Sequence, residues 1–271
     1  MQYFKHEIKV GGYSVPLTCY LPDAAPRTYY PDNRPAMIVL PGGGYEMTYP
    51  GEGEPIALSY VANGFCAFVL NYSIYPARFP QALVETLMAI RFVRENAKEY
   101  GIDPCRIAVC GFSAGGHLAA CTGTLWNNAC LEKYLGKDRS IYRPDAMVLA
   151  YPVINVASHK GSFLSLFSKR EEELTKDVRD LLNLENQVTK ETPPTFLWHT
   201  TSDSVVPAKA SLEFALALSE KRVPYEIRIW SGDRHGCGLG NYVTEPKQAP
   251  LCDHPCAAWV QDSVDFLLKT V

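Results

Sequence analysis

Short apolar runs alternate along this chain with longer segments in which apolar residues recur every three or four positions. The short runs are typical of strands buried on both faces, and the longer segments are typical of amphipathic helices. Strands are predicted at 36–40, 65–70, 107–110, 146–151, 195–199 and 225–230, and helices at 55–62, 80–100, from 114 onward, 207–221 and 253–268. This alternation predicts an α/β fold, with a mostly parallel twisted sheet and helices on both of its faces.

Two segments depart from this alternation. Residues 6–20 contain one or two strands before any helix, which predicts an antiparallel edge to the sheet. The interval 156–194 is long and carries a run of charged residues. Because structureless loops of this length are uncommon inside compact domains, we expect a small inserted helical cap there. The whole chain, 1–271, is therefore predicted to be a single domain with a cap or lid at about 156–194.

Composition narrows the class of protein. The chain has 271 residues, of which 47% are hydrophobic and 20% charged, and its net charge is −3. No basic run favours nucleic acid, and no apolar run approaches the ~18 residues that span a bilayer. The first residues lack the apolar region of a signal peptide, and most of the nine cysteines lie in or beside apolar segments. We therefore expect a cytoplasmic protein with reduced thiols.

A junction between a strand and a helix carries the clearest candidate for chemistry. The sequence Gly111-x-Ser113-x-Gly115 follows the strand 107–110 and opens the next helix. Glycines on both sides permit a tight turn with the serine at its apex. The N–H group of Ala114 then lies beside the serine at the helix N-terminus. Ser113 is the candidate nucleophile, and the alternative is an ordinary helix cap.

A glycine-rich loop follows the strand 36–40. Its sequence is Pro41-Gly42-Gly43-Gly44-Tyr45. Glycines let the backbone approach a substrate and direct N–H groups toward it. Gly43 and Gly44, together with Ala114, are therefore the candidate donors that stabilise an oxyanion.

A nucleophilic serine also needs a base and a group that orients the base. Functional groups of open α/β sheets belong at the carboxyl ends of strands. Asp203 follows the strand 195–199, and His235 follows the strand 225–230. The order Ser113, Asp203, His235 is typical of hydrolases built on this kind of sheet. The rival acids are Asp233 and Asp253, and the rival bases are His117, His159, His199 and His254.

Two further groups of residues bear on ligands. The segment Cys252-Asp253-His254-Pro255-Cys256 raises the question of zinc, but its spacing places the ligands too close for the common zinc patterns. We therefore expect neither a metal nor an organic cofactor. Tyr45, Phe112 and Trp198 are candidates for lining a substrate pocket, and core packing is the alternative for each.

Taken together and in order, these motifs resemble the α/β-hydrolase superfamily, and within it the acetyl-xylan esterase-like and hormone-sensitive-lipase-related carboxylesterases. Relatives of hormone-sensitive lipase usually have histidine before the three glycines and an acid before the serine. Here Pro41 and Phe112 occupy those places, which favours the acetyl-xylan esterase-like group. The matching segments are 41–45, 71–76, 79–80, 101–107, 111–115, 193–203 and 234–236.

The resemblance implies the α/β-hydrolase fold and a serine carboxylester hydrolase that removes short acyl groups through an acyl-enzyme. The expected substrate is an acetyl ester of a xylo-oligosaccharide or related sugar. The alternatives are a peptidase or arylformamidase that uses the same triad, because the same groups cleave amides, and a non-catalytic ligand receptor. The expected partner is a small-molecule ester rather than nucleic acid or a membrane. The sequence is compatible with a homo-oligomer and does not specify the oligomeric state.

Overall fold

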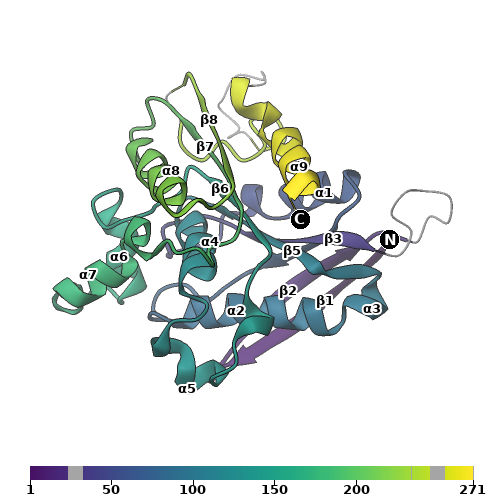
Figure 1. Cartoon of the computed structure of the whole chain (residues 1–271), viewed down its shortest axis with the longest axis horizontal. Coiled ribbons are helices and arrows are strands. Elements are labelled where there is room, and N and C mark those ends of the chain that lie inside the picture. Colours follow the sequence, from purple (N-terminus) through teal and green to yellow (C-terminus); the bar gives the residue numbers. More distant parts are fainter. Residues whose placement is uncertain (24–32, 233, 245–253, 271) are drawn as a thin grey trace.

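A computed structural model describes residues 1–23, 33–232, 234–244 and 254–270. The described strands form one eight-stranded sheet in the order β1-β2-β4-β3-β5-β6-β7-β8 (Figure 1). The first two strands pair antiparallel as a hairpin that turns at Gly11 and Gly12, and β2 pairs antiparallel with β4. The pairs from β4 to β8 are parallel, so the predicted mixed sheet with an antiparallel edge is confirmed.

The strands are β1 (Gln2–Val10), β2 (Tyr13–Leu21), β3 (Arg34–Leu40), β4 (Cys66–Leu70), β5 (Ile102–Phe112), β6 (Ala146–Ala150), β7 (Thr195–Thr200) and β8 (Tyr225–Trp230). The α-helices are α1 (Glu54–Ala62), α2 (Gln81–Glu95), α3 (Ala97–Tyr100), α4 (Ala114–Leu125), α5 (Glu132–Leu135), α6 (Lys160–Leu166), α7 (Lys176–Leu182), α8 (Lys209–Lys221) and α9 (Trp259–Thr270). No helix in the described part of the chain combines the length and apolar character needed to cross a bilayer.

Helices cover both faces of the sheet because its central strands are apolar on both sides. In β3, for example, Ile38 packs into one hydrophobic cluster and Val39 into the other, as the two-residue period of a strand requires. Helices α2, α4 and α8 pack against the first face, and α1 and α9 against the second (Figure 1). The two-sided burial explains why these strands are uninterrupted apolar runs.

The predicted helix 80–100 is two helices. The break falls at Asn96, whose backbone leaves the helical region and whose side chain donates to the carbonyl of Phe92 at 2.8 Å. This hydrogen bond offers the backbone an alternative to continuing the helix. Gly101, in the left-handed region at φ 65°, ends the second helix. The last helix, predicted from 253, begins at Trp259 after a 3₁₀ turn, and residue 253 lies outside the described residues.

The interval 156–194 is helical, with α6, α7 and 3₁₀ turns at Glu171–Glu173 and Leu184–Gln187. Phe163 of α6 and Leu182 of α7 are buried in the core cluster that also holds α4. The Ser165 hydroxyl donates to Glu46 at 2.9 Å, which ties α6 to the loop after β3. The inserted segment is therefore packed against the sheet domain rather than set apart from it.

The helix α4 approaches the ends of β3 and β5 at backbone contact. A Cβ atom added to Gly115 would lie 2.2 Å from the carbonyl oxygen of Leu40 and 2.5 Å from that of Pro41. A Cβ atom added to Gly111 would lie 2.1 Å from the carbonyl oxygen of Gly115. The obstacles are backbone atoms that cannot rotate away, so only glycine fits at either position.

We expect Gly115→Ala to lower the free energy of unfolding by about 3 kcal/mol or more, because the helix must move away from β3. The matched control is Gly101→Ala, in the left-handed helical region at φ 65° and ψ 35°, with nothing within 4 Å of the added Cβ. It should cost only the ~1 kcal/mol of a left-handed backbone. Urea denaturation followed by circular dichroism measures both, and equal losses would contradict the steric argument.

Candidate active site

Ser113 stands alone between β5 and α4, in a conformation that few non-glycine residues adopt. Its φ is 52° and its ψ is −116°. The Ser113 N–H donates to the carbonyl of Ala150 at 3.0 Å, and its own carbonyl accepts from His117 and Val153, each at 3.0 Å. These contacts to α4 and to the end of β6 hold the strained turn. The hydroxyl is thereby presented at the carboxyl end of the central strand.

A chain of hydrogen bonds runs from this hydroxyl to a buried carboxylate. The Ser113 Oγ lies 2.8 Å from Nε2 of His235, and the His235 Nδ1 lies 2.7 Å from Oδ2 of Asp203. His235 comes from the loop after β8, and Asp203 from the loop after β7. The structure thus brings the serine of the glycine-flanked turn together with the acid and the base that the strand-end argument selected.

Asp203 is held as an acceptor from several directions. Its Oδ1 accepts the N–H groups of Val205 and Val206, both at 2.9 Å, and its Oδ2 lies 3.3 Å from Nε2 of His199. Burial by itself raises the pKa of this carboxyl, but the hydrogen bonds from His199 and His235 outweigh it and bring the pKa below its ordinary range. Asp203 is therefore ionised at neutral pH.

The other described histidines have their own hydrogen-bond partners or lie elsewhere. His199 is fully buried, with Nε2 2.8 Å from the carbonyl of Val206 and Nδ1 2.8 Å from the Ser211 hydroxyl, so it supports Asp203 rather than acting as the base. His254 lies 3.0 Å from an Arg234 nitrogen. The rival acids Asp233 and Asp253 lie outside the described residues.

His117 is a buried, neutral histidine. Its Nε2 lies 3.4 Å from the carbonyl of Leu182, which can only accept, so Nδ1 accepts the Tyr45 hydroxyl at 2.9 Å. Burial lowers the pKa of His117 to about 4. The Tyr45 hydroxyl is therefore the hydrogen-bond donor to this buried histidine.

The glycine loop after β3 faces the serine. Gly43 and Gly44 line the same cleft as Ser113 and His235. Both have positive φ, and a Cβ on Gly43 would lie 2.3 Å from the carbonyl oxygen of Met47. The N–H of Gly42 is already committed, since it donates to Oε2 of Glu52 at 2.8 Å. Ala114, at the first position of α4, has an N–H without an intrahelical acceptor.

The cleft beside Ser113 has a volume of about 250 Å³. Its wall contains the apolar side chains of Met47, Tyr49 and Val205, and the polar side chains of Glu52 and His159. No lysine or arginine lines it among the described residues. A negatively charged group beside the reacting bond would therefore meet no lysine or arginine among the described lining residues.

The expectation that Tyr45, Phe112 and Trp198 line the pocket requires correction. Phe112 and Trp198 are fully buried in the cluster beneath α9, and both rings pack on Trp259. Tyr45 is 2% exposed and pairs with His117. Phe112 is adjacent to Ser113, but strand alternation turns its side chain to the opposite side of the sheet.

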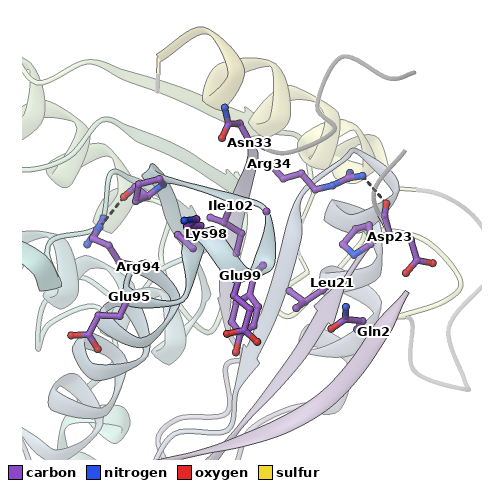
Figure 2. A pocket seen from close by; sticks show the side chains of 15 residues that line it. Gln2, Leu21, Asp23, Asn33, Arg34, Arg94, Glu95, Lys98, Glu99 and Ile102 are labelled. Carbon is purple, nitrogen blue, oxygen red and sulfur yellow. Dashed lines mark hydrogen bonds between the residues drawn. The ribbon is translucent and has the colours of Figure 1, made fainter. Parts of the chain in front are cut away.

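A larger hollow of about 710 Å³ lies elsewhere, around the amino end of β5 (Figure 2). None of the residues that line it is a candidate site residue. Figure 2 shows that its arginines point to backbone oxygens: Arg34 donates to Asp23 at 3.0 Å and Arg94 to Pro104 at 2.9 Å. Functional groups of parallel sheets gather at the other end of the strands. The smaller cleft is therefore the candidate site.

Within the described ranges, no group of three or more histidine, cysteine or acidic residues could hold a metal ion. Cys252 and Asp253 of the segment considered for zinc lie outside those ranges.

Sequence reasoning did not find three residues of the site. Glu52 and Tyr151 are buried beside it, and His159 lines the cleft from the inserted segment. His159 appeared only as a rival base. No motif or periodicity marks any of the three, because the fold alone brings them to the serine.

The fold and the hydrogen-bonded chain of Ser113, His235 and Asp203 define a serine hydrolase of the α/β-hydrolase class. Comparison with known proteins gives the family. The chain belongs to the BD-FAE family, whose profile matches residues 19–218.

Three proteins illustrate what this chain is similar to. Endo-1,4-β-xylanase B of Butyrivibrio fibrisolvens is 37% identical over 216 residues, which are 77% of this chain and 33% of that protein. Acetylxylan esterase of Xylanibacter ruminicola is 28% identical over 236 residues, which are 83% of this chain and 44% of that protein. The crystal structure of an acetyl ester-xyloside bifunctional hydrolase from Caldicellulosiruptor lactoaceticus superposes with a TM-score of 0.80 at 37% identity, covering 95% of this chain and 88% of that one.

These similarities place the chain among carboxylic ester hydrolases. The chain spans a third to about half the length of the curated relatives that it matches.

The buried histidine gives a prediction about acid stability. Between pH 6.5 and pH 4 the unfolded chain binds a proton at His117 that the folded chain does not. The folded state should therefore lose up to about 3 kcal/mol from this residue as the pH falls through that window. In His117→Gln this contribution disappears, so urea denaturation at a series of pH values should give a shallower acid dependence. An unchanged slope would contradict a buried neutral His117.

Proposed function

We propose that this chain hydrolyses esters of short acyl groups through a covalent acyl-enzyme. The observation that carries the proposal is the hydrogen-bonded chain from Ser113 through His235 to Asp203, with distances of 2.8 Å and 2.7 Å. These are the distances at which a base can take a proton from a nucleophile.

In the proposed mechanism, Ser113 Oγ attacks the ester carbonyl while Nε2 of His235 takes its proton. Asp203 holds the imidazole with Nδ1 protonated and stabilises its charged form. The N–H groups of Gly43, Gly44 and Ala114 bind the oxyanion of the tetrahedral intermediate. His235 then returns the proton to the leaving alcohol. Water, with His235 as base, releases the acid and restores the serine.

The proposed substrate is an acetyl ester of a xylo-oligosaccharide or related sugar. Two of the similar proteins carry acetylated xylan or acetyl ester-xyloside hydrolysis in their names. The cleft, at about 250 Å³, is below the ~300–1,000 Å³ of pockets that enclose drug-sized ligands, which suits a short acyl group. The lack of a described cation in its wall suits an uncharged sugar rather than an acidic one.

His159 lines the polar side of the cleft, where it could contact the sugar of the proposed substrate. The backbone N–H of Ser162 lies 3.2 Å from Nδ1 of His159 and can only donate, so Nδ1 is the acceptor. Burial lowers the pKa of His159, and a charged His235 would lower it further. The neutral ring therefore carries its proton on Nε2, as a donor suited to a sugar oxygen of the leaving group.

We expect Ser113→Ala to abolish hydrolysis of p-nitrophenyl acetate, because no other described group can form the acyl-enzyme. The variant should keep the thermal melting temperature of the wild type within a few degrees. An organophosphate should add its mass to Ser113 in the wild type and not in the variant. Hydrolysis by Ser113→Ala near the wild-type rate would refute the mechanism.

A panel of longer acyl esters, acetylated xylo-oligosaccharides and aminoacyl or formyl amides separates the esterase from the peptidase and arylformamidase alternatives.

The role of His159 is tested by His159→Asn, which keeps an acceptor for the Ser162 N–H but shortens the reach of the donor. We expect KM for an acetylated xylo-oligosaccharide to rise about fivefold, the worth of about 1 kcal/mol in one hydrogen bond. KM for p-nitrophenyl acetate, whose leaving group has no sugar hydroxyls, should stay unchanged. Equal changes for both substrates would count against a contact with the sugar.

A further inference from the structure

Glu52 is a buried carboxylate beside Ser113 that the proposed mechanism does not use. It ends the 3₁₀ turn Pro50–Glu52 and is 2% exposed. Its Oε2 accepts the N–H of Gly42 at 2.8 Å, and its Oε1 accepts the hydroxyl of Tyr151 at 2.6 Å. No ion pair with a described lysine or arginine compensates its charge. Burial raises the pKa of this carboxyl, and the hydrogen bonds from Tyr151 and Gly42 oppose that rise. A buried carboxyl held in this way in a cleft is a candidate functional group.

The two hydrogen bonds of Glu52 lead to different loops of the site. Gly42 begins the glycine loop that carries the proposed oxyanion donors. Tyr151 follows β6, and its hydroxyl accepts the N–H of Gly238 at 3.0 Å, in the segment just after His235. The ring of Tyr151 also packs edge-on against the imidazole of His235, with 5.0 Å between ring centres. Glu52 therefore connects the loop of the oxyanion donors with the loop of the base.

The fit around Gly42 shows how tightly the connection holds the loop. A Cβ atom added there would lie 2.7 Å from the Glu52 carboxylate, 2.8 Å from the carbonyl oxygen of Phe112 and 3.1 Å from Cβ of Ser113. On the other side of the loop, the Tyr72 hydroxyl donates to the carbonyl of Pro41 at 2.5 Å. The orientation of the Gly42 peptide, and hence of the two glycines that follow, is set by these contacts.

We propose that Glu52 is a positioning residue for the reaction. Its carboxylate holds the glycine loop to Tyr151 and, through Tyr151, to the segment that follows His235, so that oxyanion donors and base keep fixed positions about Ser113. This inference rests on the proposed function. Its consequence is that the loss of Glu52 weakens binding of the transition state more than binding of the ester, since the oxyanion exists only in the former.

The principal variant is Glu52→Gln, which keeps the size of the side chain. The two donors reach different oxygens of Glu52, and glutamine replaces one of these oxygens by an NH₂ group, so in the same geometry it accepts from Gly42 or from Tyr151 but not from both. We expect kcat for p-nitrophenyl acetate to fall at least about tenfold, with KM within about twofold of the wild type. The inhibition constant of a trifluoromethyl ketone, which forms an oxyanion adduct with serine, should rise in proportion to the loss of kcat/KM. Tyr151→Phe, which removes only the hydroxyl, should change kcat in the same direction.

The matched control is Glu85→Gln. Glu85 on α2 is also buried and also accepts one backbone N–H and one hydroxyl, both from Ser73 at 2.7 Å and 2.5 Å. We expect Glu85→Gln to lower the melting temperature, as Glu52→Gln should, but to leave kcat unchanged. If Glu52→Gln and Tyr151→Phe both keep kcat within about twofold of the wild type, the inference about Glu52 is overturned. The same holds if Glu85→Gln loses as much kcat as Glu52→Gln. Neither outcome affects the proposed function. A wild-type chain that hydrolyses no ester would overturn the proposed function as well.

Discussion

The geometry of the site depends on the contact between the first turn of α4 and the backbone at the ends of β3 and β5. Glycine at 111 and 115 lets these three segments meet without side chains between them. The contact leaves the intervening Ser113 with a positive φ and brings the glycine loop after β3 alongside it. β3 and β5 are also the neighbours between which the strand order reverses, and such a switch point opens a crevice for ligands. One packing constraint thus places both the proposed nucleophile and the proposed donors to the oxyanion.

A second constraint fixes the direction of the protons. The carbonyl of Val206 can only accept, so His199 carries its proton on Nε2 and directs it also toward Asp203. Asp203, ionised, can only accept from His235 Nδ1. That leaves Nε2 of His235 with a lone pair directed at the hydroxyl of Ser113. The buried His199, which does not touch the serine, therefore helps to select the tautomer that a base requires.

The sequence was sufficient for those features that follow from local pattern and chain order. Two-sided apolar runs predicted the sheet, and strand ends combined with motif order selected the residues of the hydrogen-bonded chain. The same information placed Trp198 in the pocket wrongly, since a side chain near a strand end can face either side of the sheet. Glu52 and Tyr151 escaped notice because their contacts join segments about one hundred residues apart, which no local pattern records.

The two walls of the cleft come from different parts of the chain, and this division has a consequence for specificity. The groups proposed to act on the acyl carbonyl sit on the ends of strands, where the backbone is fixed by the sheet. His159 sits in the inserted segment, which is tied to the loop after β3 by Ser165 and Lys169, both on Glu46. On the proposed mechanism, changes within 156–194 would alter which alcohol is accepted while Ser113, His235 and the proposed oxyanion donors stay in place. Such a division is consistent with the proposed substrate, in which a short acyl group is joined to a sugar that can vary.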